Sequence, residues 1–398
     1  MRSIPAFANH LPVRVRFGEG VAGTLPDVLA EIGTTSVFLL VDEGIERHNP
    51  AAAGVVGALV GGGGGWTVTR FDKPAAEPTL QMVDAAARAL AASGATAVVA
   101  VGGGSVLDTA KAARLCAQLG TTFAGFLADA PGYPVPGVPL VAVPTSAGTG
   151  SEVSGGSVVS DPGAGRKNGI AHPNLRAQYA LVDPVLTYSL PPTMTANTGI
   201  DALAQAIAAV VARVRTPVGD GIALEAVRMI TPALVAAHRD GTDTAARSAM
   251  SCGSMMAGLA MNISDCTAEH SLGQAIGGVR HVPHGLTVGL VLAETLERER
   301  VHVPGQLERV ADAMGEPDDG SRDGSRAVRA VRRILAELDF PVLGSLGFTD
   351  GDLDHLADLA LQDYFITMAP EPWTKDEVVA AFSSALHLET RSPGTGGR

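Results

Sequence analysis

The chain divides into two parts whose sequence patterns predict different secondary structure. From about residue 12 to 190, short apolar or alternating runs predict strands, and helical patterns separate them. Continuous apolar strands are typical of a parallel sheet that is buried on both faces, so this part predicts an open α/β sheet. The expected strands span 13–17, 36–41, 66–71, 97–101, 140–143 and 180–182, and the clearest helices between them span 80–92 and 105–119.

From about residue 195 onward, the sequence shows only helical patterns. Small residues are abundant in this part, which lets helices pack closely. We therefore expect an α/β domain over 1–190 and an all-α domain over 191–398, with a ligand site in the cleft between them. The expected helices span 195–214, 218–237, 242–261, 268–277, 285–299, 307–314, 327–338 and 375–386.

Composition and charge argue against several classes of function. The 41 acidic and 29 basic residues leave a net charge of −12, whereas recognition of nucleic acid or anionic lipid needs a positive field. Three scattered cysteines are too few for a disulfide framework and favour a reducing compartment. The sequence shows neither a signal-peptide core nor a run of roughly 20 apolar residues. We expect a soluble cytoplasmic protein that binds neither nucleic acid nor membrane.

A glycine-rich turn follows the buried strand at 97–101. Gly102, Gly103 and Gly104 come directly after it, and Ser105 opens the next helix. Glycines let the backbone approach a ligand, and the start of a helix attracts an anion, so the turn predicts binding of a nucleotide pyrophosphate. Ser105 and Asp108 belong to the same predicted cofactor site. The alternative is that both residues only cap the helix.

Asp42 ends an earlier strand of the predicted sheet. An acidic side chain at this place accepts hydrogen bonds from ribose hydroxyls and repels a 2′-phosphate, which favours NAD over NADP. A turn or capping aspartate is the alternative. A polar loop, PTSAGTGSE at 144–152, follows the strand at 140–143. Its small hydroxylated residues lie where open α/β sheets bind ligands, so the loop predicts ligand contact.

The helical part contains a group of residues with the chemistry of metal ligands. Asp201 and Gln205 lie one turn apart on one expected helix, and His270 and Gln274 lie one turn apart on another. Two more histidines, His281 and His284, follow. The carboxylate of Asp201 and the imidazoles of His270 and His284 suit a divalent transition metal with open coordination positions. Capping or core histidines are the alternative.

Four segments of the chain resemble the iron-containing (group III) alcohol dehydrogenases, in the same order along the sequence. They are GGGSVLDTAK, PTSAGTGSEVS, DPVLTYSLPPTMTANTGIDALAQAI and HSLGQAIGGVRHVPHG. The resemblance runs from roughly residue 17 to 290 and is looser beyond. It implies a Rossmann-like domain joined to a helical domain, as in dehydroquinate synthase. It also implies NAD(P) as cofactor, Fe²⁺ or Zn²⁺ as metal, small alcohols and aldehydes as substrates, and a homo-oligomer such as a homodimer.

The resemblance also implies roles for individual residues. Asp42 would hold the adenosine ribose, and the turn from Gly102 to Ser105 would hold the pyrophosphate. The metal would be held at the positions of Asp201, His270 and His284. Five residues would line the nicotinamide side of the site: Thr145, Ser146, Thr149, Ser154 and Lys167.

Two glutamines depart from the family pattern. Gln205 and Gln274 stand where the family normally has histidine, and a carboxamide oxygen is a poorer ligand for iron than imidazole. In one interpretation, Gln205 or water completes a metal shell. In the other, no metal binds, as in the related maleylacetate reductases. A histidine at 270, 281 or 284 would then donate the proton, with both glutamines bound to the substrate carbonyl.

The sequence therefore predicts an NAD(H)-dependent alcohol dehydrogenase or aldehyde reductase in which a metal acts as Lewis acid. Its substrate would be a small alcohol, aldehyde or keto acid. The alternatives are a maleylacetate reductase-like enzyme without metal and a nucleotide-binding protein that has lost catalysis. A dehydroquinate synthase-like lyase is disfavoured, because residues 195–290 contain no lysine for a phosphorylated sugar acid.

Overall fold

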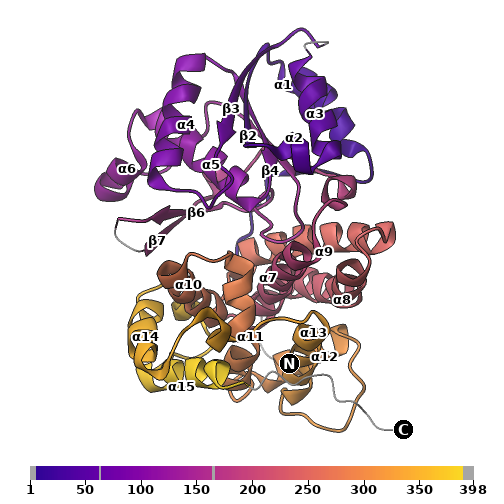
Figure 1. The fold of residues 1–398 in the computed structure, drawn as a ribbon, viewed down its shortest axis with the longest axis vertical. Coiled ribbons are helices and arrows are strands. Elements are labelled where there is room, and N and C mark those ends of the chain that lie inside the picture. Colours follow the sequence, from indigo (N-terminus) through magenta and orange to yellow (C-terminus); the bar gives the residue numbers. More distant parts are fainter. Residues whose placement is uncertain (1–5, 62–63, 164–165, 389–398) are drawn as a thin grey trace.

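A computed structural model describes residues 6–61, 64–163 and 166–388 (Figure 1). The N-terminal part is a six-stranded parallel sheet in the order β1-β8-β5-β4-β2-β3. All six strands predicted from the sequence are confirmed. Their bounds are β1 Arg14–Phe17, β2 Ser36–Asp42, β3 Thr67–Lys73, β4 Ala97–Gly102, β5 Leu140–Pro144 and β8 Tyr179–Val182.

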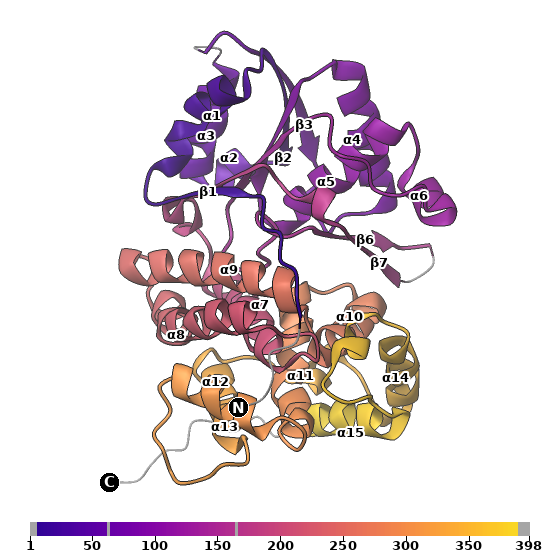
Figure 2. The ribbon, with the colours of Figure 1, turned by 180° about the vertical axis from the view of Figure 1, so that it is seen from behind.

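Helices cover both faces of this sheet because alternate strand residues point to opposite sides. On one face, Phe38 and Leu40 of β2 pack with helices α4 (Leu80–Ser93) and α5 (Gly104–Leu119). On the other face, Leu39 of β2 packs with α1 (Leu25–Ile32) and α3 (Pro50–Val60), which explains why the strands read as continuous apolar runs. The short α2 (Ile45–His48) and α6 (Phe123–Asp129) complete the helices of this part (Figures 1 and 2).

The strand order places a topological switch point between β2 and β4. The chain runs from β2 outward to β3 and then returns to β4 on the other side of β2. Open α/β sheets bind ligands outside the carboxyl ends of the strands at such a point. Asp42 and Gly102 are the last residues of these two strands, so the fold brings the two predicted cofactor elements to the same crevice.

An antiparallel hairpin follows β5, and the sequence analysis did not predict it. It consists of β6 (Gly156–Asp161) and β7 (Arg166–Ala171). β7 reads RKNGIA, which lacks the β-branched alternation of a typical strand. The hairpin lies outside the main sheet, between it and the helical domain (Figure 1).

The C-terminal part is all-helical, as predicted. α7 and α8 are long and apolar enough to cross a membrane, and 83% of the apolar window of α7 and 44% of that of α8 are buried inside the fold; buried core helices share this length and composition. All eight predicted helices are present, and α14 is the one that was missed. The bounds are α7 Pro192–Val211, α8 Pro217–Arg239, α9 Thr244–Ser264, α10 Ala268–Arg280, α11 His284–Glu299, α12 Pro304–Ala313, α13 Ser325–Glu337, α14 Leu353–Leu361 and α15 Lys375–Leu386.

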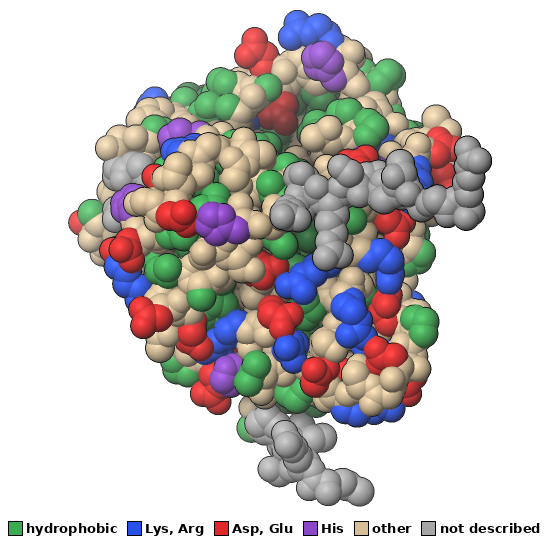
Figure 3. All heavy atoms as spheres, turned by 60° about the horizontal axis from the view of Figure 1, so that its bottom comes forward, with side chains coloured by type: hydrophobic (Ala, Val, Ile, Leu, Met, Phe, Trp, Pro, Cys, Tyr) green, Lys and Arg blue, Asp and Glu red, His purple; other side chains and the backbone are tan. Residues whose placement is uncertain are grey.

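The outer end of the helical domain has a mixed surface. Basic and acidic side chains are interspersed on the face that Figure 3 shows. Ion pairs such as Arg300–Asp323, with 3.0 Å between the guanidinium and carboxylate atoms, join neighbouring segments there. Exposed pairs of this kind contribute little stability, and this face carries no field of one sign.

Close backbone contacts join the two parts. A Cβ atom on Gly258 of α9 would lie 2.7 Å from the Cα atom of Gly150, which lies in the loop after β5. A Cβ atom on Gly148 of the same loop would lie 2.7 Å from Thr198 of α7. Since only glycine allows these approaches, the loop after β5 lies directly against two helices of the C-terminal part.

Candidate active site

Three helices bring together a carboxylate and two imidazoles. Asp201 lies on α7, His270 on α10, and His284 is the first residue of α11. The Asp201 Oδ1 atom is 3.6 Å from His270 Nε2 and 3.8 Å from His284 Nε2. One ligand atom from each of the three residues lies within 4.8 Å of the others. The structure therefore joins three residues that stand far apart in the sequence.

Glycine at position 285 makes this arrangement possible. A Cβ atom there would lie 2.1 Å from the carbonyl oxygen of Asn197, so α11 begins in direct contact with the backbone of α7. This contact sets His284 beside Asp201. The chain reverses between α10 and α11 through His281, which caps α10 with a left-handed φ of 51°.

Two oxygen atoms of this cluster lack hydrogen bonds. Asp201 Oδ1 and Gln205 Oε1 are buried, and neither has a hydrogen-bond partner among the described residues. Leaving such atoms unpaired is costly, so buried oxygens of this kind call for a ligand. Two oxygens and two imidazole nitrogens match the donors that Fe²⁺ and Zn²⁺ accept. The residues present thus fit a divalent metal, since Gln205 lies one helical turn after Asp201 and interacts with its carboxylate.

Glu269 fixes the orientation of the His270 ring. Its Oε1 atom lies 2.8 Å from His270 Nδ1, and the same carboxylate accepts hydrogen bonds from the backbone N–H and hydroxyl of Thr267. Holding Nδ1 in this way directs Nε2 toward Asp201, as outer-shell carboxylates do at metal-binding histidines. Glu269 was not among the predicted site residues, although its place directly before His270 was an available signal.

Electrostatics distinguish the two histidines. Burial lowers the pKa of His270, but the Asp201 and Glu269 carboxylates beside the ring outweigh this effect and raise the pKa above its usual value. Burial lowers the pKa of His284 to about 4. Burial also raises the pKa of Asp201, yet the adjacent imidazoles hold that pKa below its usual range. The cluster therefore carries a neutral His284 whose Nε2 can act as a ligand.

Gln274 and His281 lie farther from this cluster. Gln274 is half-buried on α10, one turn after His270. His281 is exposed at the end of α10. Neither has a described contact with the three clustered residues. The roles predicted for them in catalysis stay predictions.

The glycine turn after β4 packs against the loop after β5. A Cβ atom on Gly104 would lie 2.6 Å from the Thr149 side chain, and one on Gly103 would lie 3.4 Å from the Ser146 hydroxyl. Thr145 donates its backbone N–H to the carbonyl of Gly102 at 3.0 Å. The turn, called the glycine cradle below, thus packs closely against this loop at the start of α5, and Ser105 lies in the first turn of that helix.

Two predicted cofactor residues have partners inside the protein. Asp108 accepts hydrogen bonds from the Ser151 hydroxyl at 2.6 Å and from the Val158 backbone at 2.9 Å. Ser154 accepts a hydrogen bond at 3.3 Å from Lys111, which is fully buried. These contacts tie the loop after β5 to α5. Direct contact of Asp108 and Ser154 with a cofactor stays a prediction.

Lys167 lies between the hairpin and the helical domain. Its Nζ atom pairs with Glu77 at 2.6 Å. A Cβ atom on Gly277 of α10 would lie 3.4 Å from the same Nζ atom. The charge of Lys167 also contributes to the lowered pKa of His284. The structure thus places this predicted nicotinamide residue beside the metal-type cluster.

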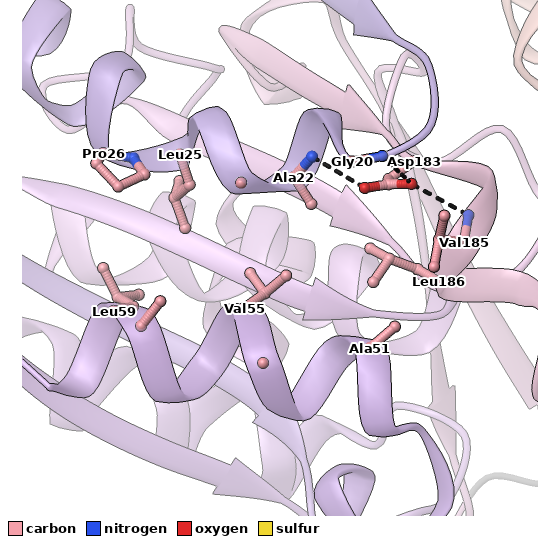
Figure 4. A pocket seen from close by; sticks show the side chains of 13 residues that line it. Gly20, Ala22, Leu25, Pro26, Ala51, Val55, Leu59, Asp183, Val185 and Leu186 are labelled. Atoms are coloured by element: carbon pink, nitrogen blue, oxygen red, sulfur yellow. Dashed lines mark hydrogen bonds between the residues drawn. The ribbon is translucent and has the colours of Figure 1, made fainter.

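A separate cavity of about 300 Å³ lies within the α/β part (Figure 4). Its lining is almost entirely apolar, with Leu25, Val55 and Leu186 pointing toward it. The one carboxylate there, Asp183, accepts backbone hydrogen bonds from Gly20 and Ala22, each at 3.1 Å. Because the Asp183 carboxylate already accepts these backbone hydrogen bonds, the cavity lacks the free ligand atoms that the cluster of Asp201, His270 and His284 offers.

The structure combines an open parallel α/β sheet that has a topological switch point with a helical part that carries a metal-type cluster. Comparison with known proteins gives the family. Residues 12–184 match the family described as iron-containing alcohol dehydrogenase, and residues 195–386 match the family described as Fe-containing alcohol dehydrogenase, C-terminal. The chain belongs to the iron-containing alcohol dehydrogenase family and is an oxidoreductase that acts on CH–OH groups.

Individual relatives agree with this assignment. The chain is 36% identical over 324 residues to the "Probable alcohol dehydrogenase EutG" of Escherichia coli (strain K12), covering 81% of this chain and 80% of that protein. It is 30% identical over 391 residues to alcohol dehydrogenase 4 of Saccharomyces cerevisiae (strain YJM789), covering 97% and 99%. The crystal structure of sulfoacetaldehyde reductase from Bifidobacterium kashiwanohense in complex with NAD+ superposes with a TM-score of 0.88 at 26% identity, covering 97% and 100%.

Proposed function

We propose that the protein interconverts small alcohols and their aldehydes or ketones with NAD(H) as the hydride carrier, at the junction of its two parts. The observation that carries this proposal is the buried cluster of Asp201, His270 and His284, in which Asp201 Oδ1 and the nearby Gln205 Oε1 accept no hydrogen bond from the described residues. A site with metal-ligand chemistry next to a dinucleotide crevice suits hydride transfer to a polarised carbonyl. The relatives named as alcohol dehydrogenases support the same reaction.

Four residues would hold the metal. Asp201 and Gln205 would contribute oxygen, and His270 and His284 would contribute Nε2 nitrogens. When bound, Fe²⁺ or Zn²⁺ would act as a Lewis acid on the substrate oxygen. Glu269 would keep His270 in the orientation needed for binding.

The crevice at the switch point would hold NAD. Asp42 would accept the ribose hydroxyls, and the cradle of glycines at 102–104 would hold the pyrophosphate at the start of α5. The loop with Thr145, Ser146 and Thr149 would then face the nicotinamide. Because this loop lies against α7 and α9, the nicotinamide would point toward the cluster.

We also infer a cytoplasmic homo-oligomer, such as a homodimer. β1 is an edge strand of the six-stranded sheet, and Phe17 at its end is 40% exposed. An unpaired strand edge can pair with a second copy of the chain. Size-exclusion chromatography with light scattering measures this state directly, and a monomeric mass would contradict it.

A second candidate is a metal-independent reductase in which a histidine donates the proton. The glutamine at position 205 favours it, because a carboxamide oxygen is a poorer ligand for iron than imidazole. Elemental mass spectrometry of anaerobically purified protein, with NADH-dependent aldehyde reduction before and after chelation, separates the two candidates. About one metal ion per chain and loss of activity on chelation support the first. Activity without metal supports the second, whereas NADH binding without turnover on aldehydes and keto acids supports a protein that has lost catalysis.

A further inference from the structure

A buried lysine lies directly beside the predicted ribose-binding aspartate. Lys73 is the last residue of β3 and is paired in register with Asp42, the last residue of β2. The Lys73 side chain is 0% exposed, and its Nζ atom is 3.1 Å from Asp42 Oδ1. The same Nζ atom donates to the carbonyl oxygens of Pro74 at 2.8 Å and Ala76 at 2.6 Å.

These contacts use the whole donor capacity of the lysine. An ammonium group has three N–H donors, and three acceptors surround this one. Lys73 therefore presents no free donor to the crevice. The side chain of Asp42, by contrast, is 27% exposed, and Lys73 contacts only one of its oxygens. The group that faces a ligand is thus the carboxylate, and the lysine lies behind it.

Lys73 also opposes the effect of burial on Asp42. Burial raises the pKa of the Asp42 carboxyl above its usual value, and the charge and hydrogen bond of Lys73 limit this rise. Without the Lys73 ammonium, the Asp42 carboxylate would lose its ion-pair partner and part of the interaction that favours its ionised form. An ionised, fixed carboxylate is what a ribose with two free hydroxyls needs, and it is also what repels a 2′-phosphate.

We propose that Lys73 is a positioning residue that sets the preference for NAD over NADP by holding Asp42 in place as an anion. This inference rests on the ribose-binding role proposed above for Asp42. It predicts an unusual direction of effect. A cation near the ribose normally favours the 2′-phosphate, so its removal would weaken NADPH binding. Because Lys73 acts through Asp42, its removal strengthens NADPH binding relative to NADH.

The test is a fluorescence titration of NADH and NADPH into four proteins: the unchanged chain, Asp42→Asn, Lys73→Met and the double variant. We expect the unchanged chain to bind NADH more tightly. Asp42→Asn reduces this preference, and Lys73→Met reduces it by about tenfold, as expected for the loss of one charge-assisted hydrogen bond. In the double variant, Lys73→Met adds nothing to Asp42→Asn, because the lysine acts only through the aspartate.

A matched control is available in the same domain. Lys111 is also 0% exposed, and it donates to two serines and the Gly156 carbonyl. Lys111→Met therefore removes a buried lysine of the same kind without touching Asp42. We expect it to change both affinities by the same factor. If Lys73→Met does not fold, Lys73→Gln keeps two N–H donors but lacks the charge, and we expect a shift in the same direction.

The outcomes separate this inference from the proposed function. An unchanged cofactor ratio in Asp42→Asn removes the aspartate from the ribose site and overturns the proposed cofactor geometry. A relaxed ratio in Asp42→Asn, with an unchanged or increased NADH preference in Lys73→Met and Lys73→Gln, overturns the role of Lys73 alone. Equal shifts of the NADH-to-NADPH affinity ratio in Lys73→Met and Lys111→Met also overturn the role of Lys73. They would show that loss of any buried lysine in this domain disturbs the cofactor site.

Discussion

Replacement of Glu269 by glutamine tests how the metal-type cluster is built. Glu269 is 1% exposed, and its carboxylate holds His270 Nδ1 at 2.8 Å and the Thr267 backbone at 3.1 Å. Glutamine has the same size and keeps one acceptor oxygen. It loses the negative charge and the second acceptor, so His270 is no longer fixed by a charged partner.

The magnitude follows from these contacts. Loss of an outer-shell partner costs about 10- to 100-fold in metal affinity, which corresponds to about 1.4–2.8 kcal/mol. The bond to His270 is short, buried and charge-assisted, so we expect a value toward the upper end, near 100-fold. Affinity of the protein for NADH should change little, because the cofactor crevice lies on the other domain.

The assay is a titration of chelator-stripped protein with Co²⁺ or Zn²⁺, followed by visible absorption or competition with a chromophoric chelator. Glu294→Gln is the matched control. Glu294 is a buried glutamate on α11 that binds Arg332 and Ser384, away from the cluster. A folded Glu269→Gln protein that binds metal as tightly as the unchanged chain would refute the reasoning. So would an equal loss of metal affinity in Glu294→Gln.

Three further predictions concern the junction, the cluster and a buried acid. Gly258→Ala adds a Cβ atom 2.7 Å from another backbone atom and should cost about 1–3 kcal/mol in unfolding experiments. Gly57→Ala, with nothing within 4 Å, should cause no loss. His284→Ala should remove bound metal, measured by elemental mass spectrometry, while the NADH affinity survives. Burial raises the pKa of Glu299 from 4.5 to about 7. The folded state therefore binds the Glu299 proton more tightly than the unfolded state does, and the free energy of unfolding falls as pH rises from 4.5 through 7. Glu299→Gln should therefore gain about 3 kcal/mol relative to the unchanged chain between pH 4.5 and 8, measured by urea unfolding.

The sequence predicted the framework well because the framework follows from local patterns. β2 and β4 read as continuous apolar runs since both faces of the sheet are covered, and the helices of the second part have long apolar stripes. The hairpin of β6 and β7 was not predicted because its polar residues show no strand pattern. The two strands are defined by their pairing with each other. The side chains of Asp201, His270 and His284 could be predicted as metal ligands from their residue types. Their proximity could be seen only in the folded chain.

The residues that support the site were beyond sequence reasoning for a physical reason. Lys73 and Lys111 are charged side chains that are 0% exposed. Charged residues are normally on the surface, so a pattern places them there. Each is buried only because a tertiary partner compensates its charge, and those partners come from other elements or from capping geometry that the pattern does not contain.

The junction explains why small residues are concentrated in this protein where the two parts meet. Thr198, which contacts Gly148 of the cofactor loop, lies three residues before Asp201 on the same face of α7. The loop is tied on its other side to α5 through Asp108 and Lys111. A short path of direct contacts therefore connects the glycine cradle to the metal-type cluster. Hydride transfer loses rate steeply when the reacting atoms shift by about 1 Å, so these close contacts favour a constant distance between the glycine cradle and the cluster.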